Sequence, residues 1–159
     1  MLDVIDRRIL TLLQENGRIS NAEIARQVEM APSAVLERVR RLEERGIVRG
    51  YYAQLDAKSL ERPMLAFVLV RSDERTGEMN AGQALARIAE VLEVHHVAGQ
   101  DCYLVKVRVR DSEALGRLLR EQFGAIPQVR STQSTIVLET IKEGWTLPID
   151  PAPERAARR

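Results

Sequence analysis

The chain has 159 residues, of which 45% are hydrophobic and 30% are charged, and its formal net charge is +1. This length and composition provide for one ordinary domain or two small ones, and they exclude a membrane protein. The single cysteine, Cys102, excludes an internal disulfide framework, and no cluster of cysteine and histidine suggests a metal site. Because the N-terminus also lacks the layout of a secretion signal, we expect a cytoplasmic protein.

The beginning of the chain predicts two short helices. Asp3 and Asp6 resemble an N-cap followed by an acidic third residue, and apolar residues then recur at helical spacing until Gly17. Ser20 and Glu23 have the spacing of a capping box, in which a hydroxyl and a carboxylate satisfy free backbone amides at a helix start. We therefore expect the first helix to end before Gly17 and the second to begin at Ser20.

A third helix follows after a short turn. Pro32 suits its first position, because proline lacks the amide that would be unpaired there, and Gly46 suits its end. Its apolar residues form one stripe that we expect to be buried: Val35, Val39 and Leu42. The residues expected on the opposite side are Ala34, Glu37, Arg38, Arg41 and Arg45.

Residues 1–50 therefore predict a helix-turn-helix that binds double-stranded DNA. Five arginines lie between Arg38 and Arg49, although the net charge of the whole chain is only +1. Arginine on a recognition helix bridges phosphates or pairs with guanine edges in the major groove, and we expect Arg49 to reach a phosphate. The alternative is a solvated helix face with ion pairs such as Glu37 to Arg41. The two preceding helices and the tight turn favour DNA.

The rest of the chain predicts a linker strand at residues 51–62 and then a second domain at residues 63–145. Its four strands are expected in "PMLAFVLV", "EVHHVAG", "DCYLVKVRVR" and "STIVLETI". In the third of these, alternation predicts that Tyr103, Val105, Val107 and Val109 point inward. Two helical stripes lie between the strands: Leu85, Ile88, Ala89 and Leu92, and then Leu115, Leu118, Leu119 and Phe123.

This order predicts a ferredoxin-like βαββαβ domain, so the whole chain is expected to be an α+β protein. Helices cover only one face of such a sheet, and its other face is either solvated or paired with another subunit. The tail at residues 146–159 has prolines and no apolar run, so we expect it to be flexible.

Several long stretches resemble the Lrp/AsnC family of bacterial and archaeal regulators, also called feast/famine regulators. They are "LDVIDRRILTLLQENGRISNAEIARQV", "VLERVRRLEERGIVRGYYAQLD", "VAGQDCYLVKVRV" and "VRSTQSTIVL". The resemblance runs from residue 2 to about residue 142. It implies a winged-type helix-turn-helix domain joined by a strand linker to a ferredoxin-like domain for ligand sensing and oligomerisation. It also implies homodimers that assemble into octamers, with a free amino acid bound between dimers.

The resemblance also suggests site residues. The residues that match the family's recognition helix are Ser33, Ala34, Glu37, Arg38 and Arg41. The family's effector loop commonly reads Gly-Asp-aromatic-Asp, and the matching residues here are Gly99, Gln100, Asp101 and Cys102. Thr132 and Ser134 match hydroxyls that hold the ligand in the family, and Asp101 is a candidate partner for an ammonium group. The altered loop leaves a regulator without a ligand as the alternative.

Two further classes of function remain open. Some siroheme decarboxylases resemble the same family, and His95 and His96 are the only histidines that such an enzyme could use. Adjacent residues in a strand point to opposite faces, however, so the two histidines cannot line one site. The arginine face of the third helix favours a regulator that is not an enzyme and needs no catalytic residue. The other class is a module that senses an amino acid and regulates a protein partner without binding DNA.

Overall fold

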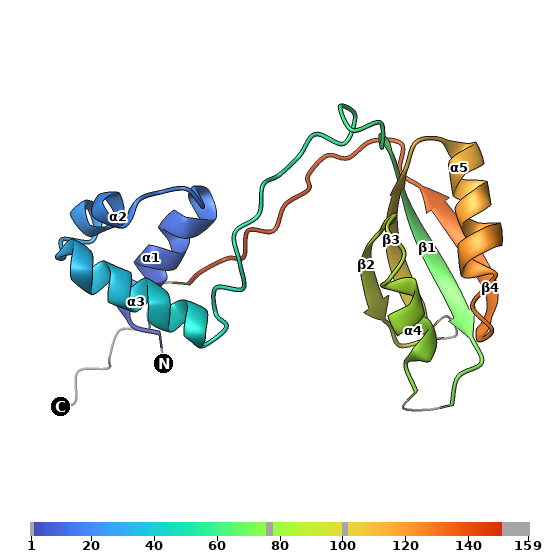
Figure 1. Ribbon diagram of the computed structural model, residues 1–159, viewed down its shortest axis with the longest axis horizontal. Helices are drawn as coiled ribbons and strands as arrows, with labels where there is room; N and C mark the ends of the chain where they lie inside the picture. The colour runs from blue at the N-terminus through green and yellow to red at the C-terminus, as the bar shows by residue number, and fades with distance from the viewer. Residues whose placement is uncertain (1, 76–77, 100–101, 151–159) are drawn as a thin grey trace. The chain divides into compact units, whose positions relative to one another are not determined.

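A computed structural model of the protein describes residues 2–75, 78–99 and 102–150. The chain divides into two units; in Figure 1 the first is blue to teal together with the red segment near the end of the chain, and the second is green to orange. The first unit contains the chain up to Gln54 together with the segment from Glu143, and the second runs from Leu55 to Lys142.

The first unit contains the three predicted helices, α1 (Val4–Glu15), α2 (Asn21–Gln27) and α3 (Pro32–Glu44). Asp3 and Asp6 form a reciprocal capping box at α1, and the Ser20 hydroxyl accepts the Glu23 amide at the start of α2. Both helix starts therefore agree with the sequence prediction. The apolar faces of the three helices meet in one core, formed by Ile9, Leu12, Ile24, Ala25, Val28, Val35, Val39 and Leu42.

The linker differs from the prediction, because residues 51–62 contain no strand. A strand needs a neighbouring backbone to accept and donate its hydrogen bonds. In this segment the recorded backbone bonds are local, from the Leu60 amide to the Asp56 carbonyl and from the Arg62 amide to the Ala57 carbonyl. Residues 57–61 thus form turns, and no strand partner is present within the single chain that the structure describes.

The second unit has the predicted βαββαβ order (Figure 1). Its elements are β1 (Met64–Ser72), α4 (Asn80–Leu85), β2 (Val91–His96), β3 (Tyr103–Val109), α5 (Ser112–Arg117), which continues as the π-helical segment η1 (Leu118–Phe123), and β4 (Val129–Ile136). The strands form one antiparallel sheet in the order β2-β3-β1-β4. This topology is that of a ferredoxin-like domain.

Alternation along the two central strands separates the faces of the sheet. Tyr103, Val105, Val107 and Val109 are all buried in the core, which confirms the inward set predicted for β3. In β1 the core residues are Ala66, Val68 and Val70. Phe67 and Leu69 alternate with them, so their side chains lie on the other face, where they are half-buried.

Several element boundaries in this unit differ from the prediction, two of them with a clear physical cause. The helix expected to include Leu92 ends at Leu85, and Leu92 lies in β2, where it is half exposed. Leu85, Ile88, Ala89 and Leu92 have helical spacing in the sequence only because a short helix is followed closely by a strand. Strand β4 ends at Ile136 rather than near Ile141, because β1 begins at Met64 and, after the bond from the Val137 amide to the Leu65 carbonyl, offers no further backbone partner in the described chain.

The segment after β4 returns to the first unit. Residues 146–150 were expected to belong to a flexible tail, but the structure places Leu147 and Asp150 in hydrogen bonds with α1. The rest of the predicted tail, residues 151–159, lies outside the described residues.

Candidate nucleic-acid interface

The rotation of α3 is set by its buried stripe. Val35, Val39 and Leu42 are buried, as predicted. At about 100° per residue, the direction opposite to this stripe passes close to Glu37 and Glu44. The exposed residues on that side are Ser33, Glu37, Arg40, Arg41 and Glu44. We call Ser33, Glu37, Arg40 and Arg41 the reading face of α3.

Arg38 does not belong to this face, and its expected position opposite the buried stripe is wrong. Its Nη1 donates to Oδ2 of Asp3 at 2.7 Å and to Oδ1 of Asp6 at 2.6 Å. Only 28% of the Arg38 side chain is exposed. The two carboxylates raise the pKa of Arg38 above its usual value. Arg38 therefore ties α3 to the start of α1, a tertiary contact that helical periodicity does not reveal.

The two arginines that do face outward are held only by weak pairs. Arg41 Nε lies 3.1 Å from Glu37 Oε1, and Arg40 Nε lies 3.1 Å from Glu44 Oε1. These exposed i,i+4 pairs stabilise a helix by only about 0.3–0.5 kcal/mol. Such a pair is easily exchanged for a phosphate. Arg40 was missed by the sequence prediction, although the helical rotation about the correctly predicted stripe places it on this side.

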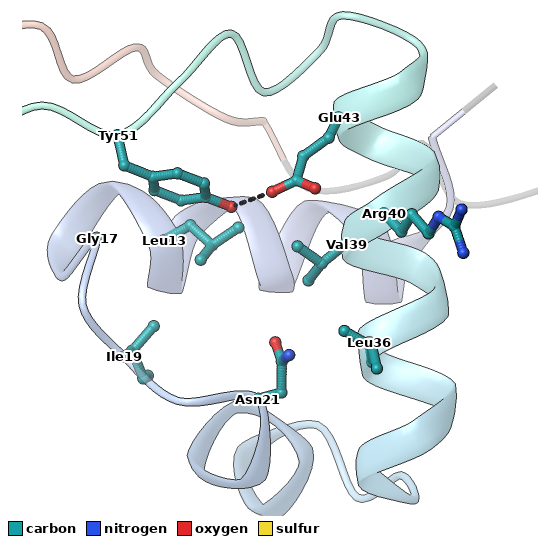
Figure 2. Close-up of a pocket in the computed structure, with 9 residues that line it drawn as sticks. All are labelled: Leu13, Gly17, Ile19, Asn21, Leu36, Val39, Arg40, Glu43 and Tyr51. Atoms are coloured by element: carbon teal, nitrogen blue, oxygen red, sulfur yellow. Dashed lines mark hydrogen bonds between the residues drawn. The ribbon is translucent and has the colours of Figure 1, made fainter.

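A hollow of about 420 Å³ lies beside α3. Figure 2 shows its lining, formed by Leu13, Gly17, Ile19, Asn21, Leu36, Val39, Arg40, Glu43 and Tyr51. The Tyr51 hydroxyl donates to Oε1 of Glu43 at 2.9 Å, and burial together with this carboxylate raises the pKa of Tyr51 to about 12. In the same view the guanidinium of Arg40 points away from the hollow. Glu43 is therefore engaged by the linker, while Arg40 is directed outward.

The other predicted DNA-binding residues lie near the reading face. Ser33 is exposed in the first turn of α3, where residues of a recognition helix come nearest to bases. Ala34 is half-buried. Arg45 caps the end of α3, and both it and Arg49 are exposed.

The predicted effector residues do not form one pocket in a single chain. The Cys102 amide donates to the Val70 carbonyl at 3.0 Å, and Val70 pairs with Thr132 on the other side of β1. Cys102 and Thr132 are thus separated by two strand spacings, which is about 10 Å. Ser134 is exposed on β4, and Gly99 is exposed with φ +139°. Gln100 and Asp101 lie outside the described residues.

A polar cluster that the sequence did not reveal supports the strand after this turn. Glu74 accepts the Tyr103 hydroxyl at 2.8 Å and the Ala81 amide at 2.7 Å. Burial raises the pKa of Tyr103 to about 12, and the Glu74 carboxylate acts in the same direction. Because Tyr103 directly follows Cys102, this cluster fixes the end of the turn to the loop before α4.

The two histidines occupy different environments, as the strand alternation predicted. His95 Nε2 lies 3.0 Å from Oε2 of Glu93, whereas the His96 ring lies 5.3 Å from the ring of Tyr103. Among the described residues, no three side chains of His, Cys, Asp or Glu gather as metal ligands would. No helix in the described ranges is both long and apolar enough to cross a membrane.

Comparison with known proteins covers both units. Residues 2–49 match the model of a winged helix-turn-helix DNA-binding domain, and residues 65–147 match that of the Lrp/AsnC ligand-binding domain. The leucine-responsive regulatory protein of Klebsiella pneumoniae is 39% identical over 93% of this chain and 92% of its own length. The chain belongs to the Lrp/AsnC family. It is therefore a DNA-binding transcriptional regulator with a winged helix-turn-helix and a ferredoxin-like domain.

Solved structures of other Lrp/AsnC regulators share this fold. A transcriptional regulator from Neisseria meningitidis in complex with L-Met is 32% identical, with a TM-score of 0.87 over 94% of this chain and 98% of that one. A feast or famine regulatory protein from M. tuberculosis, complexed with L-methionine, is 36% identical, with a TM-score of 0.83 over 90% of this chain and 96% of that one. These three similar proteins are all named as regulators.

Proposed function

We propose that this Lrp/AsnC regulator reads its DNA sites, in the cytoplasm, through the reading face of α3. The outward orientation of Arg40 and Arg41 on a helix that is fixed by its buried stripe carries this proposal. Arg40 and Arg41 contact phosphates or guanine edges, and Ser33 and Glu37 approach the bases. Arg45 and Arg49 contact the flanking backbone.

A homodimer places two such helices in successive major grooves. The sheet face that carries Phe67 and Leu69 supports this proposal, because neither helix of the second unit covers it and both side chains are only half-buried. A second copy would bury them by sheet packing. Further assembly, up to an octamer, brings several reading faces onto one DNA and bends it.

An amino acid binds at the junction between copies and changes the assembly. Two relatives hold L-methionine, and this chain keeps exposed hydroxyls at Thr132 and Ser134 that can accept and donate to the charged ends of an amino acid. Because Cys102 and Thr132 are about 10 Å apart, a second copy must complete the site. The ligand acts through a difference in its affinity for two assemblies.

The DNA assignment is tested with duplexes selected for tight binding from a random-sequence pool. Replacing Arg40 and Arg41 together by alanine should weaken binding and flatten its salt dependence, since each phosphate contact contributes about 0.9 to the slope of log affinity against log salt. Arg87→Ala is the control, because this exposed arginine lies in the other unit. An unchanged slope in the double variant would show that α3 does not contact phosphates.

The effector assignment is tested separately by calorimetry with each of the twenty amino acids. Heat of binding and a change in sedimentation with one of them would identify the effector. If none binds, the chain is a regulator without an amino-acid ligand, and Cys102 in place of the family's acid gives the physical reason for that loss.

A further inference from the structure

The outer side of α1 carries two polar residues that bind the end of the described chain. Arg7 and Gln14 are seven residues apart in a helix, which places them on one side of α1, separated by about 10 Å along its axis. In Figure 1 the red end of the described chain lies beside α1, within the first unit. We call residues 143–150 the C-terminal strap.

Two residues of the strap, Leu147 and Asp150, bind α1 through their backbone. Gln14 accepts the Leu147 amide with Oε1 at 2.7 Å and donates from Nε2 to the Leu147 carbonyl at 3.1 Å. Arg7 donates from Nη1 to the Asp150 carbonyl at 2.8 Å. Gln14 therefore satisfies both polar groups of one residue, as a neighbouring strand would.

The spacing of the two anchors matches an extended chain. From Leu147 to Asp150 an extended backbone covers about 10 Å. This equals the distance between Gln14 and Arg7 along the helix, so the strap runs along α1 in the opposite direction to it. One such contact could be incidental, but two contacts in register define a binding surface for an extended segment.

We propose that the C-terminal strap docks on the Arg7 and Gln14 side of α1 in its own chain and forms a second link between the sensing domain and the DNA-binding unit. The first link enters this unit at the end of α3 through the linker. The strap instead leaves β4, whose last recorded bond to the sheet joins the Val137 amide to the Leu65 carbonyl, and ends on α1.

The strap has a physical route to the reading face. The start of α1 holds Asp3 and Asp6, and both carboxylates bind Arg38 of α3. A displacement of α1 is therefore passed to α3 through a charged contact as well as through the core. We call this transmission from the amino-acid site to the reading face the coupling step. It rests on the proposed function, in which the amino acid binds at Thr132 and Ser134 on β4, the strand that precedes the strap.

The chain has one tryptophan, Trp145, and it lies in the strap. Time-resolved fluorescence anisotropy of the full-length protein therefore measures the mobility of the strap directly. Gln14→Ala removes both bonds to Leu147 without weakening the helix, since alanine is the best helix former. Trp145 is itself 78% exposed, so some fast motion is expected in every variant. We expect the fast component of the anisotropy decay to have a larger amplitude in Gln14→Ala than in the wild type and the matched control Glu15→Ala. The same decay in all three proteins would overturn the docking.

Cross-linking determines which copy the strap binds. In a Cys102→Ser background, cysteines replace Glu15, which lies next to the anchor Gln14, and Leu147, which is bound through its backbone, and the full-length protein is treated with a short bismaleimide. A product with the mass of one chain is the expected result. Products with the mass of two chains would show that the strap docks on a neighbouring copy, and would overturn the assignment to its own chain.

The coupling step is tested by measuring DNA affinity with and without L-methionine and, if that has no effect, each other amino acid. We expect the wild-type change in affinity to be reduced at least twofold in Gln14→Ala and to be retained in Glu15→Ala. An unchanged response in Gln14→Ala would overturn the coupling. If no amino acid changes the wild-type affinity, the proposed effector and the coupling both fail, while the anisotropy result still decides whether the strap docks.

Discussion

Arg38 donates one nitrogen to two carboxylates, and one of them, Asp6, is largely buried. Arg38→Ala would leave the Asp6 carboxylate with its solvation reduced and its cationic partner removed. We expect this substitution to lower the free energy of unfolding by about 1–2 kcal/mol at pH 7. Arg41→Ala is the control, and the loss of its exposed pair with Glu37 should change stability by less than about 0.5 kcal/mol. Urea unfolding measures both values, and equal losses in the two variants would contradict the supporting role of Arg38.

The pH dependence of the same contact has a definite sign. The Asp6 amide, and to a smaller extent Arg38, lower the pKa of Asp3 below its ordinary value, 3.8. A carboxyl with a lowered folded pKa contributes stability above its unfolded value, and this is lost as the pH falls through the folded value. The difference in unfolding free energy between the wild type and Arg38→Ala should therefore narrow below about pH 4. Urea unfolding at pH 7 and pH 3 measures it, and a constant difference would refute the pairing with Asp3.

Gly82 is required by the close approach of an aromatic ring. A Cβ at this position would lie 2.6 Å from Cε1 of Tyr103, whose ring is buried in the core and whose hydroxyl is held by Glu74. Gly82→Ala should lower the free energy of unfolding of the ferredoxin-like domain by about 1–3 kcal/mol. In Gly116→Ala the nearest atom to the new methyl group is the flexible end of Arg120. Alanine should therefore raise the free energy of unfolding by about 0.5–1 kcal/mol, because it favours the helix more than glycine does. Thermal unfolding compares the two, and a neutral Gly82→Ala would mean that the ring can move.

At the scale of elements, the sequence predicted what local chemistry decides. The caps at Asp3 and Ser20, the proline at the start of α3 and the alternation in β3 all depend on neighbours within a few residues, and the structure agrees with each. The start of α3 and the buried stripe that orients the reading face could therefore be predicted from the sequence.

The misplaced features depend on partners that are distant in the sequence. Arg38 was placed opposite the buried stripe, because its contacts with Asp3 and Asp6 lie at the start of another helix. The end of β4 is decided by where β1 stops offering backbone groups, and the strap by polar groups on α1. Periodicity shows which side of an element is apolar, but it does not show which polar groups of other elements will contact its polar side.

Strand β4 presents the two hydroxyls of the proposed amino-acid site. Thr132 and Ser134 are exposed, so Thr132→Val keeps the shape of the side chain and should change the unfolding free energy by less than about 0.5 kcal/mol. The loss of a hydrogen bond to a charged ligand end should weaken amino-acid binding about tenfold or more. Calorimetry with L-methionine, or with whichever amino acid binds the wild type, measures the change. Thr135→Val, on the opposite face of β4, is the control, and equal effects in both variants would contradict the site.

For the whole molecule, the open face of the sheet decides whether the regulator acts as one chain or several. Leu69 is half-buried on this face, on the central strand β1 and opposite Leu104 of β3. Leu69→Glu leaves the carboxylate solvated in a single chain, but would bury an unpaired charge between two packed sheets. We therefore expect the variant to sediment at the single-chain mass of 18.0 kDa with its circular dichroism unchanged.

Leu138→Glu is the matched control, because Leu138 is 99% exposed and lies beyond the end of β4. It should retain the mass of the wild-type assembly. If Leu69→Glu also retains that mass, the copies associate through another surface. Since two reading faces on one DNA require two chains, loss of assembly in Leu69→Glu should also weaken binding to a site with two half-sites far more than binding to one half-site. Equal weakening on both duplexes would show that assembly through this face of the sheet does not contribute to DNA binding.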